Sequence, residues 1–206
     1  IKDENVFKKI VQCSEYIEEN GLTYITIDHK KAAYEAVSHL ISIGKKDIYL
    51  FSMKKDYTYS TLRREGLIEA MKDSGLEFKR ENEILLDELS IKEAQKHMNI
   101  ILNNREVKNI GIFAVSDVIA IGVIKALNSK NIKIPQEAAI VGFDNIDFSA
   151  VIEPSLTTVS QPGYELGVES VKSLMRKITG ENNNPEKIIL DYELIVRETT
   201  NKFVLK

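Results

Sequence analysis

Strand-like and helix-like segments alternate along almost the whole chain, and this alternation limits the folds that it can adopt. Short apolar runs rich in β-branched and aromatic residues recur, and most are followed by a segment with apolar residues at helical spacing. The predicted strands span residues 10–13, 22–28, 47–52, 83–87, 110–115, 138–143, 156–159 and 188–197. Short connections between such elements predict an α/β fold, in which helices cover both faces of a mainly parallel sheet.

The predicted helices have recognisable ends. Ser90 and Glu93 form a capping-box pattern at the start of one helix, and Gly44 is placed to end another. The regular alternation stops in the last third of the chain, where all four prolines lie. There a short strand is followed by a long helix over 166–178, and this region is therefore predicted to be organised differently from the rest.

Composition disfavours several classes of protein. The 206 residues carry 28 Lys and Arg against 31 Asp and Glu, a formal charge of −3 that does not favour a nucleic-acid-binding surface. The single cysteine, Cys13, cannot form an internal disulfide, which fits a reducing, cytoplasmic environment. No apolar stretch approaches the ~18–20 residues of a membrane span, so no membrane partner is expected. The chain begins at Ile1 rather than Met, which favours a fragment that has lost an upstream segment.

One predicted helix is apolar on every side. Residues 118–124, Val-Ile-Ala-Ile-Gly-Val-Ile, leave no evident face for solvent. Two interpretations fit this pattern. The helix is buried within one subunit, or it packs one face on the sheet and the other in a subunit interface.

The sequence lacks the usual signatures of catalysis. It has no phosphate-binding loop, no dinucleotide fingerprint and no nucleophile elbow. His29, His39 and His97 lie far apart, without companions at zinc-ligand spacing, and are predicted to be structural. Asp144 and Asp147 have no neighbours that complete a metal site. We therefore predict that the chain is not an enzyme and holds neither a metal nor another cofactor.

Polar and aromatic residues follow several predicted strands, at the edge of the sheet where ligands of open α/β proteins collect. They are Asp28, Tyr57, Tyr59, Arg63, Ser116, Asp117, Asp144 and Asn145. Carboxylates accept hydrogen bonds from hydroxyls, Arg donates them, and aromatic rings cover apolar faces, so this mixture suits a polyhydroxylated ligand. For single residues a structural role fits equally well: Ser116 and Asp117 as helix caps, Asp144 in a turn, and Arg63 in a surface ion pair.

Five motifs together resemble the lactose/galactose repressor (LacI/GalR) family, in matching order and spacing. They are residues 63–71, 113–117, 141–145, 154–162 and 193–200. The resemblance covers nearly the whole chain from about Ile10. It implies a periplasmic-binding-protein-like fold, with two doubly wound parallel-sheet lobes, crossover connections between them and an effector in the cleft. It also implies that the C-terminal lobe holds residues 21–151 and 187–203, and that an incomplete N-terminal lobe holds 1–18 and 156–181.

The resemblance also assigns roles to individual residues. Arg63 and Asp144 match the arginine and aspartate that hold effector hydroxyls. Further ligand-binding positions correspond to Ser116, Phe113, Tyr59, Tyr57 and Asp28. The apolar helix corresponds to one at the dimer interface of relatives, which implies interface roles for Val118, Ile119, Gly122 and Val123.

Two departures from the family pattern stand out. Gly44-Lys45 replaces the usual Gly-His pair, and the DNA-binding headpiece, the hinge helix and the first strands of the N-terminal lobe have no counterpart.

The implied function is the effector-sensing core of a cytoplasmic transcriptional repressor. Its partners would be a small polar effector of the sugar or nucleoside class, a second copy in a homodimer, and operator DNA through a headpiece outside these residues. The alternative is a periplasmic sugar-binding protein of a transporter, which shares the fold. Residues 156–159 and 194–199 favour the repressor.

Overall fold

The chain folds into two compact units, each built from two separate segments. The computed structural model describes residues 9–54 and 57–201. Of these, unit 1 contains residues 9–28 and 161–192, and unit 2 contains 29–54, 57–160 and 193–201. The chain therefore passes from one unit to the other three times, after Asp28, Ser160 and Tyr192, in agreement with the crossover connections that the family resemblance implies.

Unit 2 is built on a six-stranded sheet in the order β4-β3-β5-β6-β7-β9. Its strands are β3 (Asp47–Met53), β4 (Glu83–Leu86), β5 (Ile110–Ala114), β6 (Ala138–Asp144), β7 (Thr157–Ser160) and β9 (Glu193–Ile195). All neighbours run parallel except β7 and β9, which are antiparallel. Almost every residue of β3, β5 and β6 is buried, as expected for central strands covered on both faces.

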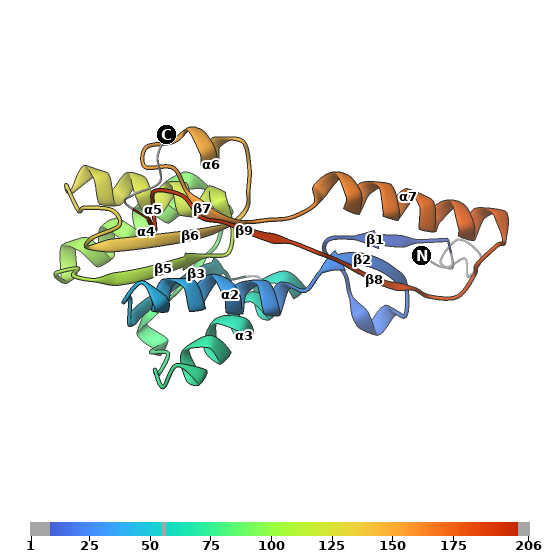
Figure 1. Ribbon diagram of the computed structural model, residues 1–206, viewed down its shortest axis with the longest axis horizontal. Coiled ribbons are helices and arrows are strands. Elements are labelled where there is room, and N and C mark those ends of the chain that lie inside the picture. The colour runs from blue at the N-terminus through green and yellow to red at the C-terminus, as the bar shows by residue number, and fades with distance from the viewer. Residues whose placement is uncertain (1–8, 55–56, 202–206) are drawn as a thin grey trace. The chain divides into compact units, whose positions relative to one another are not determined.

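Two pairs of helices cover the two faces of this sheet, α2 with α3 on one and α4 with α5 on the other (Figure 1). Their bounds are α2 (His29–Ser42), α3 (Thr58–Asp73), α4 (Ile91–Asn104) and α5 (Asp117–Ser129), and a short helix, α6 (Phe148–Val151), follows β6. A 3-10 turn, η2 (Arg80–Asn82), leads into β4. The predicted capping box is confirmed, because the Ser90 hydroxyl accepts a 3.1 Å hydrogen bond from the amide of Glu93.

A glycine lies at the closest approach of each helix pair. A Cβ added to Gly66 of α3 would lie 2.1 Å from the carbonyl oxygen of Lys30 in α2. A Cβ added to Gly122 of α5 would lie 2.4 Å from the carbonyl oxygen of Ile91 in α4. The absence of a side chain at these two positions lets each pair pack in close contact.

The apolar character of α5 follows from its surroundings within the chain. Its outer side meets α4 at Gly122, its inner side packs on β5 and β6, and Ile119 and Val123 are fully buried. Val118 is half-buried. Burial inside one chain therefore accounts for the composition of α5 without a partner. The dimer interface expected over Val118, Ile119, Gly122 and Val123 stays a prediction.

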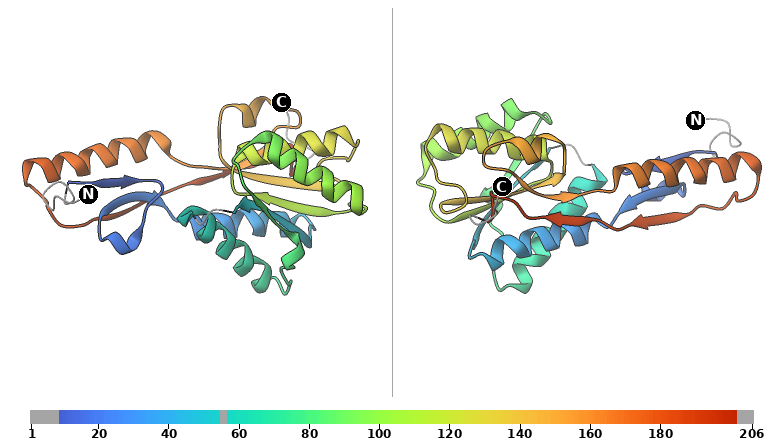
Figure 2. Two further views of the ribbon diagram at one scale, coloured as in Figure 1. Left: turned by 180° about the vertical axis from the view of Figure 1, so that it is seen from behind. Right: turned by 45° about the horizontal axis from the view of Figure 1, so that its top comes forward.

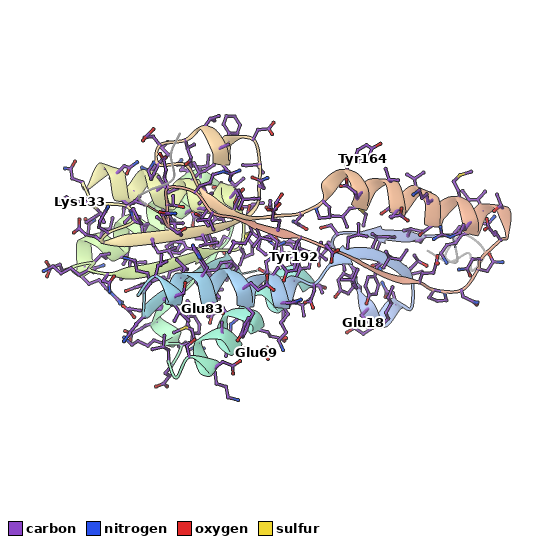
Figure 3. All side chains as sticks on the ribbon, in the orientation of Figure 1. Glu18, Glu69, Glu83, Lys133, Tyr164 and Tyr192 are labelled. Atoms are coloured by element: carbon purple, nitrogen blue, oxygen red, sulfur yellow. The ribbon has the colours of Figure 1, made fainter. Side chains whose placement is uncertain are left out.

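Unit 1 has a three-stranded parallel sheet in the order β1-β2-β8. Its elements are β1 (Val11–Cys13), a 3-10 turn η1 (Glu18–Asn20), β2 (Thr23–Ile27), α7 (Gly163–Thr179) and β8 (Lys187–Leu190). Helix α7 packs along β1 and β2, and it runs beside the sheet in every view (Figure 2). The ring of Tyr16 stacks on that of Tyr24 at 4.1 Å, whereas Tyr164 projects from α7 away from the sheet (Figure 3).

The predicted lobe boundaries are wrong at the strands beside the crossovers. Strands β2 and β8 pair in unit 1, although 21–151 and 187–203 were assigned to the C-terminal lobe. Strand β7 pairs with β6 in unit 2, although 156–181 was assigned to the other lobe. The strand predicted over 188–197 is in fact two strands in different sheets, β8 and β9. Local sequence fixes that a segment is extended, but not which sheet it joins.

Two alanine substitutions test the role of Gly122. Gly122→Ala places a methyl group against the α4 backbone, and we expect it to lower the free energy of unfolding by about 1–3 kcal/mol. Gly167→Ala is the matched control within a helix, because a Cβ there meets no atom within 4 Å. It should raise stability by up to about 1 kcal/mol through helix propensity. Urea unfolding followed by circular dichroism compares them, and equal effects of both variants would contradict the close packing.

Candidate functional site

The carboxyl edge of the unit 2 sheet is organised around Arg63, on the first turns of α3. The residue is only 3% exposed. The Nη1 atom donates a hydrogen bond to the carbonyl oxygen of Val115, just after β5, and lies 3.7 Å from Oδ1 of Asp144 at the end of β6. The structure thus brings together the arginine and aspartate that the sequence singles out, and the predicted alternative of a surface ion pair for Arg63 is excluded by its burial.

Two aromatic rings lie against the guanidinium group. Its central carbon lies 3.4 Å from the ring centroid of Phe143 and 4.8 Å from that of Tyr59. Tyr59 in turn stacks on Tyr57, with centroids 5.4 Å apart and ring planes 13° from parallel. Such contacts stabilise a buried cation through the negative faces of the rings. The two predicted tyrosines therefore belong to one half-buried cluster beside Arg63.

His29 is a further neighbour of Arg63, although the sequence did not predict it as a residue of this site. It begins α2, is 1% exposed, and places Nδ1 3.2 Å from Nη2 and 3.4 Å from Nε of Arg63. Its ring centroid lies 5.9 Å from that of Phe143. The signal in the sequence is its position directly after the strand that ends at Asp28, but a lone histidine without companions gives no indication of its partner.

The backbone at Asp144 and Asn145 has an unusual conformation. Their φ angles are 111° and 53°, values that residues other than glycine rarely adopt and that cost on the order of 1–3 kcal/mol each. The turn is held from β7 and from beyond β9. The Asn145 amide donates to Thr158 (3.3 Å), its side chain donates to Ser160 (3.0 Å), and Arg197 donates to its Oδ1 atom (2.8 Å). These bonds fix the direction in which Asp144 leaves the sheet.

Asp117 holds the other side of the same turn through hydrogen bonds. Its carboxylate is fully buried and accepts hydrogen bonds from the Ile146 amide (3.0 Å), the Ser149 hydroxyl (2.6 Å) and the Thr158 hydroxyl (2.6 Å). Burial raises the pKa of Asp117 to about 6; the three hydrogen bonds oppose this rise, and the charge of Asp144 adds to it. Asp117 therefore holds the loop that presents Asp144.

The remaining predicted site residues differ in their surroundings. Ser116 is buried and is the N-cap of α5, its hydroxyl accepting from the Val118 amide at 3.3 Å. Phe113 is fully buried in the sheet, and its predicted ligand contact stays untested; the aromatic ring nearest to the Arg63 guanidinium belongs to Phe143. Asp28 lies exposed directly after β2, and its predicted role as a ligand contact stays untested.

Other polar groups of the described residues are engaged elsewhere. His39 contacts Thr200 and His97 contacts Glu93, in agreement with structural roles. No group of three or more His, Cys, Asp or Glu in the described part of the chain could hold a metal ion. A hollow of about 250 Å³ lies between the ends of β3 and β4 and the start of α3, where Arg64 pairs with Glu83.

The family of this chain follows from its similarity to known proteins. A model described as a periplasmic binding protein-like domain matches residues 21–200. The chain belongs to this family. The resemblance to LacI/GalR regulators and the periplasmic-binding-protein-like fold are both confirmed.

Two sugar complexes and one curated regulator illustrate the relationship. The chain is 35% identical over 187 residues to the transcriptional regulator MalR of Clostridium butyricum, covering 89% of this chain and 55% of MalR. It is similar to a LacI family regulator from Enterococcus faecium with bound ribose (28% identity, TM-score 0.76, 86% of this chain and 65% of that one). It is also similar to a complex of the regulator CelR with cellobiose (25% identity, TM-score 0.83, 92% and 57%).

The chain spans about half the length of the curated relatives that it matches. Those relatives are named as transcriptional regulators and not as enzymes. Among the helices formed by residues 9–54 and 57–201, none is long and apolar enough to span a membrane.

The buried Asp117 predicts a pH dependence of stability. Because its pKa is higher in the folded than in the unfolded chain, the folded state holds a proton that the unfolded state releases between about pH 4 and 6. The stabilisation from this group is therefore complete below pH 4 and is lost as the pH rises through 6, by up to about 3 kcal/mol. Urea unfolding of the wild type and Asp117→Asn at pH 4–7 measures this. The stability of the wild type relative to the variant should fall with rising pH, and a constant difference would refute the assignment.

Proposed function

We propose that the chain is the part of a LacI-type transcriptional regulator that senses a neutral polyhydroxylated effector, a sugar or a nucleoside. The effector binds at the carboxyl edge of the unit 2 sheet, in the cleft that the family forms between its two lobes. The observation that carries this proposal is the buried Arg63 guanidinium, in contact with two aromatic rings and 3.7 Å from Asp144.

The chemistry of this cluster suits a ligand without net charge. The guanidinium and the Asp144 carboxylate carry opposite charges, so together they offer donors and acceptors to hydroxyl groups but no excess charge for a phosphate. The tyrosine pair offers a flat apolar surface and two phenolic hydroxyls. Relatives with bound ribose and cellobiose support the same ligand class.

The site is connected to the strands that lead into the crossovers. Asn145, next to Asp144, is hydrogen-bonded to Ser160, the last residue before the second crossover, and to Arg197, which follows β9. We propose that effector binding at Asp144 biases the conformation of these strands and so the activity of the whole regulator, including DNA binding by a headpiece outside these residues. An effector can shift such an equilibrium only by its difference in affinity for the two states.

The alternative of a periplasmic sugar-binding protein of a transporter shares the fold but has less support. The matching relatives named above are transcriptional regulators. We therefore retain the regulator as the proposed function.

Ligand binding tests the site directly. Isothermal calorimetry with D-ribose, cellobiose, maltose, cytidine and adenosine should identify at least one ligand, and ribose 5-phosphate should bind more weakly than ribose. Arg63→Ala and Asp144→Ala should each weaken binding at least tenfold, about 1.4 kcal/mol. Arg64→Ala is the matched control, since the neighbouring Arg64 pairs with Glu83 outside this cluster. Unchanged affinity in Arg63→Ala would show that the site lies elsewhere.

We further propose that the regulator is a homodimer whose interface includes α5 and α6. Two large apolar side chains of α6, Phe148 and Val151, are 67% and 75% exposed. Ser149 ties α6 to Asp117 at the start of α5, so these side chains lie next to the helix assigned to the interface. Exposed apolar groups of this size are favourable at an interface that excludes water.

A charge at the proposed interface should separate the subunits. Phe148→Glu places a carboxylate among apolar groups, and sedimentation velocity should show at least a tenfold weaker dimer than in the wild type. Tyr164→Glu, on an exposed position of α7 in unit 1, is the control and should leave association unchanged. A monomeric wild type, or a dimer that tolerates Phe148→Glu, would contradict the proposed interface.

A further inference from the structure

The contact between His29 and Arg63 restricts the protonation state of a buried imidazole. Nδ1 of His29 lies within reach of two donors of Arg63, Nη2 and Nε. A guanidinium group donates and cannot accept, so Nδ1 must carry a lone pair. His29 is therefore an acceptor towards Arg63, and a proton on its ring belongs on Nε2.

We infer that His29 is a positioning residue for effector recognition, which orients the Arg63 guanidinium through its Nδ1 lone pair. This inference rests on the function proposed for the Arg63 cluster. His29 itself need not touch the ligand.

The contacts of Arg63 involve both ends of its guanidinium group. The carbonyl of Val115 holds the Nη1 end of the guanidinium, and Phe143 and Tyr59 restrict its tilt. The edge formed by Nε and Nη2 faces His29. Without an acceptor there, two donors of a buried cation lose a partner, which favours a different side-chain conformation.

A proton on Nδ1 would reverse the contact, because Nδ1 would then be a donor facing two donors of a cation.

Two amide substitutions separate the acceptor from the rest of the side chain. The oxygen of Asn is two bonds from Cβ, as Nδ1 of His is, so His29→Asn can keep an acceptor facing Arg63. The oxygen of Gln is three bonds from Cβ, as Nε2 is, so His29→Gln of similar size removes the acceptor from that place. Both variants are uncharged, and circular dichroism checks that both fold.

The first measurement needs no ligand. The Nε–Hε proton of Arg63, assigned in ¹⁵N–¹H spectra by its loss in Arg63→Lys, should exchange slowly in the wild type and in His29→Asn. It should exchange at least tenfold faster in His29→Gln. Equal exchange in all three proteins would overturn the inference, even if no effector were found. If His29→Gln fails to fold, His29→Leu replaces it, because leucine also lacks an acceptor: slow exchange of the Arg63 proton in that variant would overturn the inference.

The second measurement uses D-ribose and cellobiose as probes. At pH 7.5 we expect His29→Asn to bind within about twofold of the wild type and His29→Gln at least tenfold more weakly. Binding by His29→Gln as tight as that of the wild type would overturn the inference. Failure of both sugars to bind would count against these ligands in the proposed function, and the exchange measurement would still decide the role of His29.

Discussion

A guanidinium group cannot lose its charge in a protein, and at Arg63 it is almost wholly buried. Burial of such a cation is tolerated only where acceptors and opposite charge compensate for the lost water. The carboxyl edge of unit 2 supplies them from separate parts of the chain: a backbone carbonyl after β5, a carboxylate at the end of β6, an imidazole at the start of α2, and rings from α3 and β6. The positions of four elements are thereby linked to one side chain.

The carboxylate that compensates the charge of Arg63 is itself held in place by a further set of hydrogen bonds. Asp144 compensates the charge of Arg63 from an unfavourable backbone conformation, which its neighbours must hold in place. Asp117 holds this conformation by accepting three hydrogen bonds, two from the segment after β6 and one from β7. Arg197 contributes by donating a hydrogen bond to Asn145. The buried Asp117 and the half-buried Arg197 thus hold the turn between β6 and α6, and loss of the hydrogen-bond partners of either residue would be costly.

Much of the fold and part of the site could be predicted from local sequence. Periodicity located the strands and helices, because buried parallel strands are continuously apolar, and the capping box at Ser90 has a local mechanism. The family motifs indicated Arg63 and Asp144. Sheet membership of β2, β7 and β8 could not be predicted, because pairing depends on distant partners. For the same reason Asp117 resembled a helix cap, and His29 resembled a structural histidine without an identifiable partner.

The antiparallel pairing of β7 with β9 bears on how the two units could be separated. Ser160 lies opposite Glu193 in that pair, so the two chain ends left by removing residues 161–192 are already neighbours within one sheet. In the sheet of unit 2, residues 161–192, which belong to unit 1, therefore take the place of the turn that would join β7 and β9 in an ordinary hairpin. A two-residue turn between Ser160 and Glu193, with a start at His29, would therefore give unit 2 as a continuous single-domain protein that retains Arg63, Asp144, Asp117 and His29.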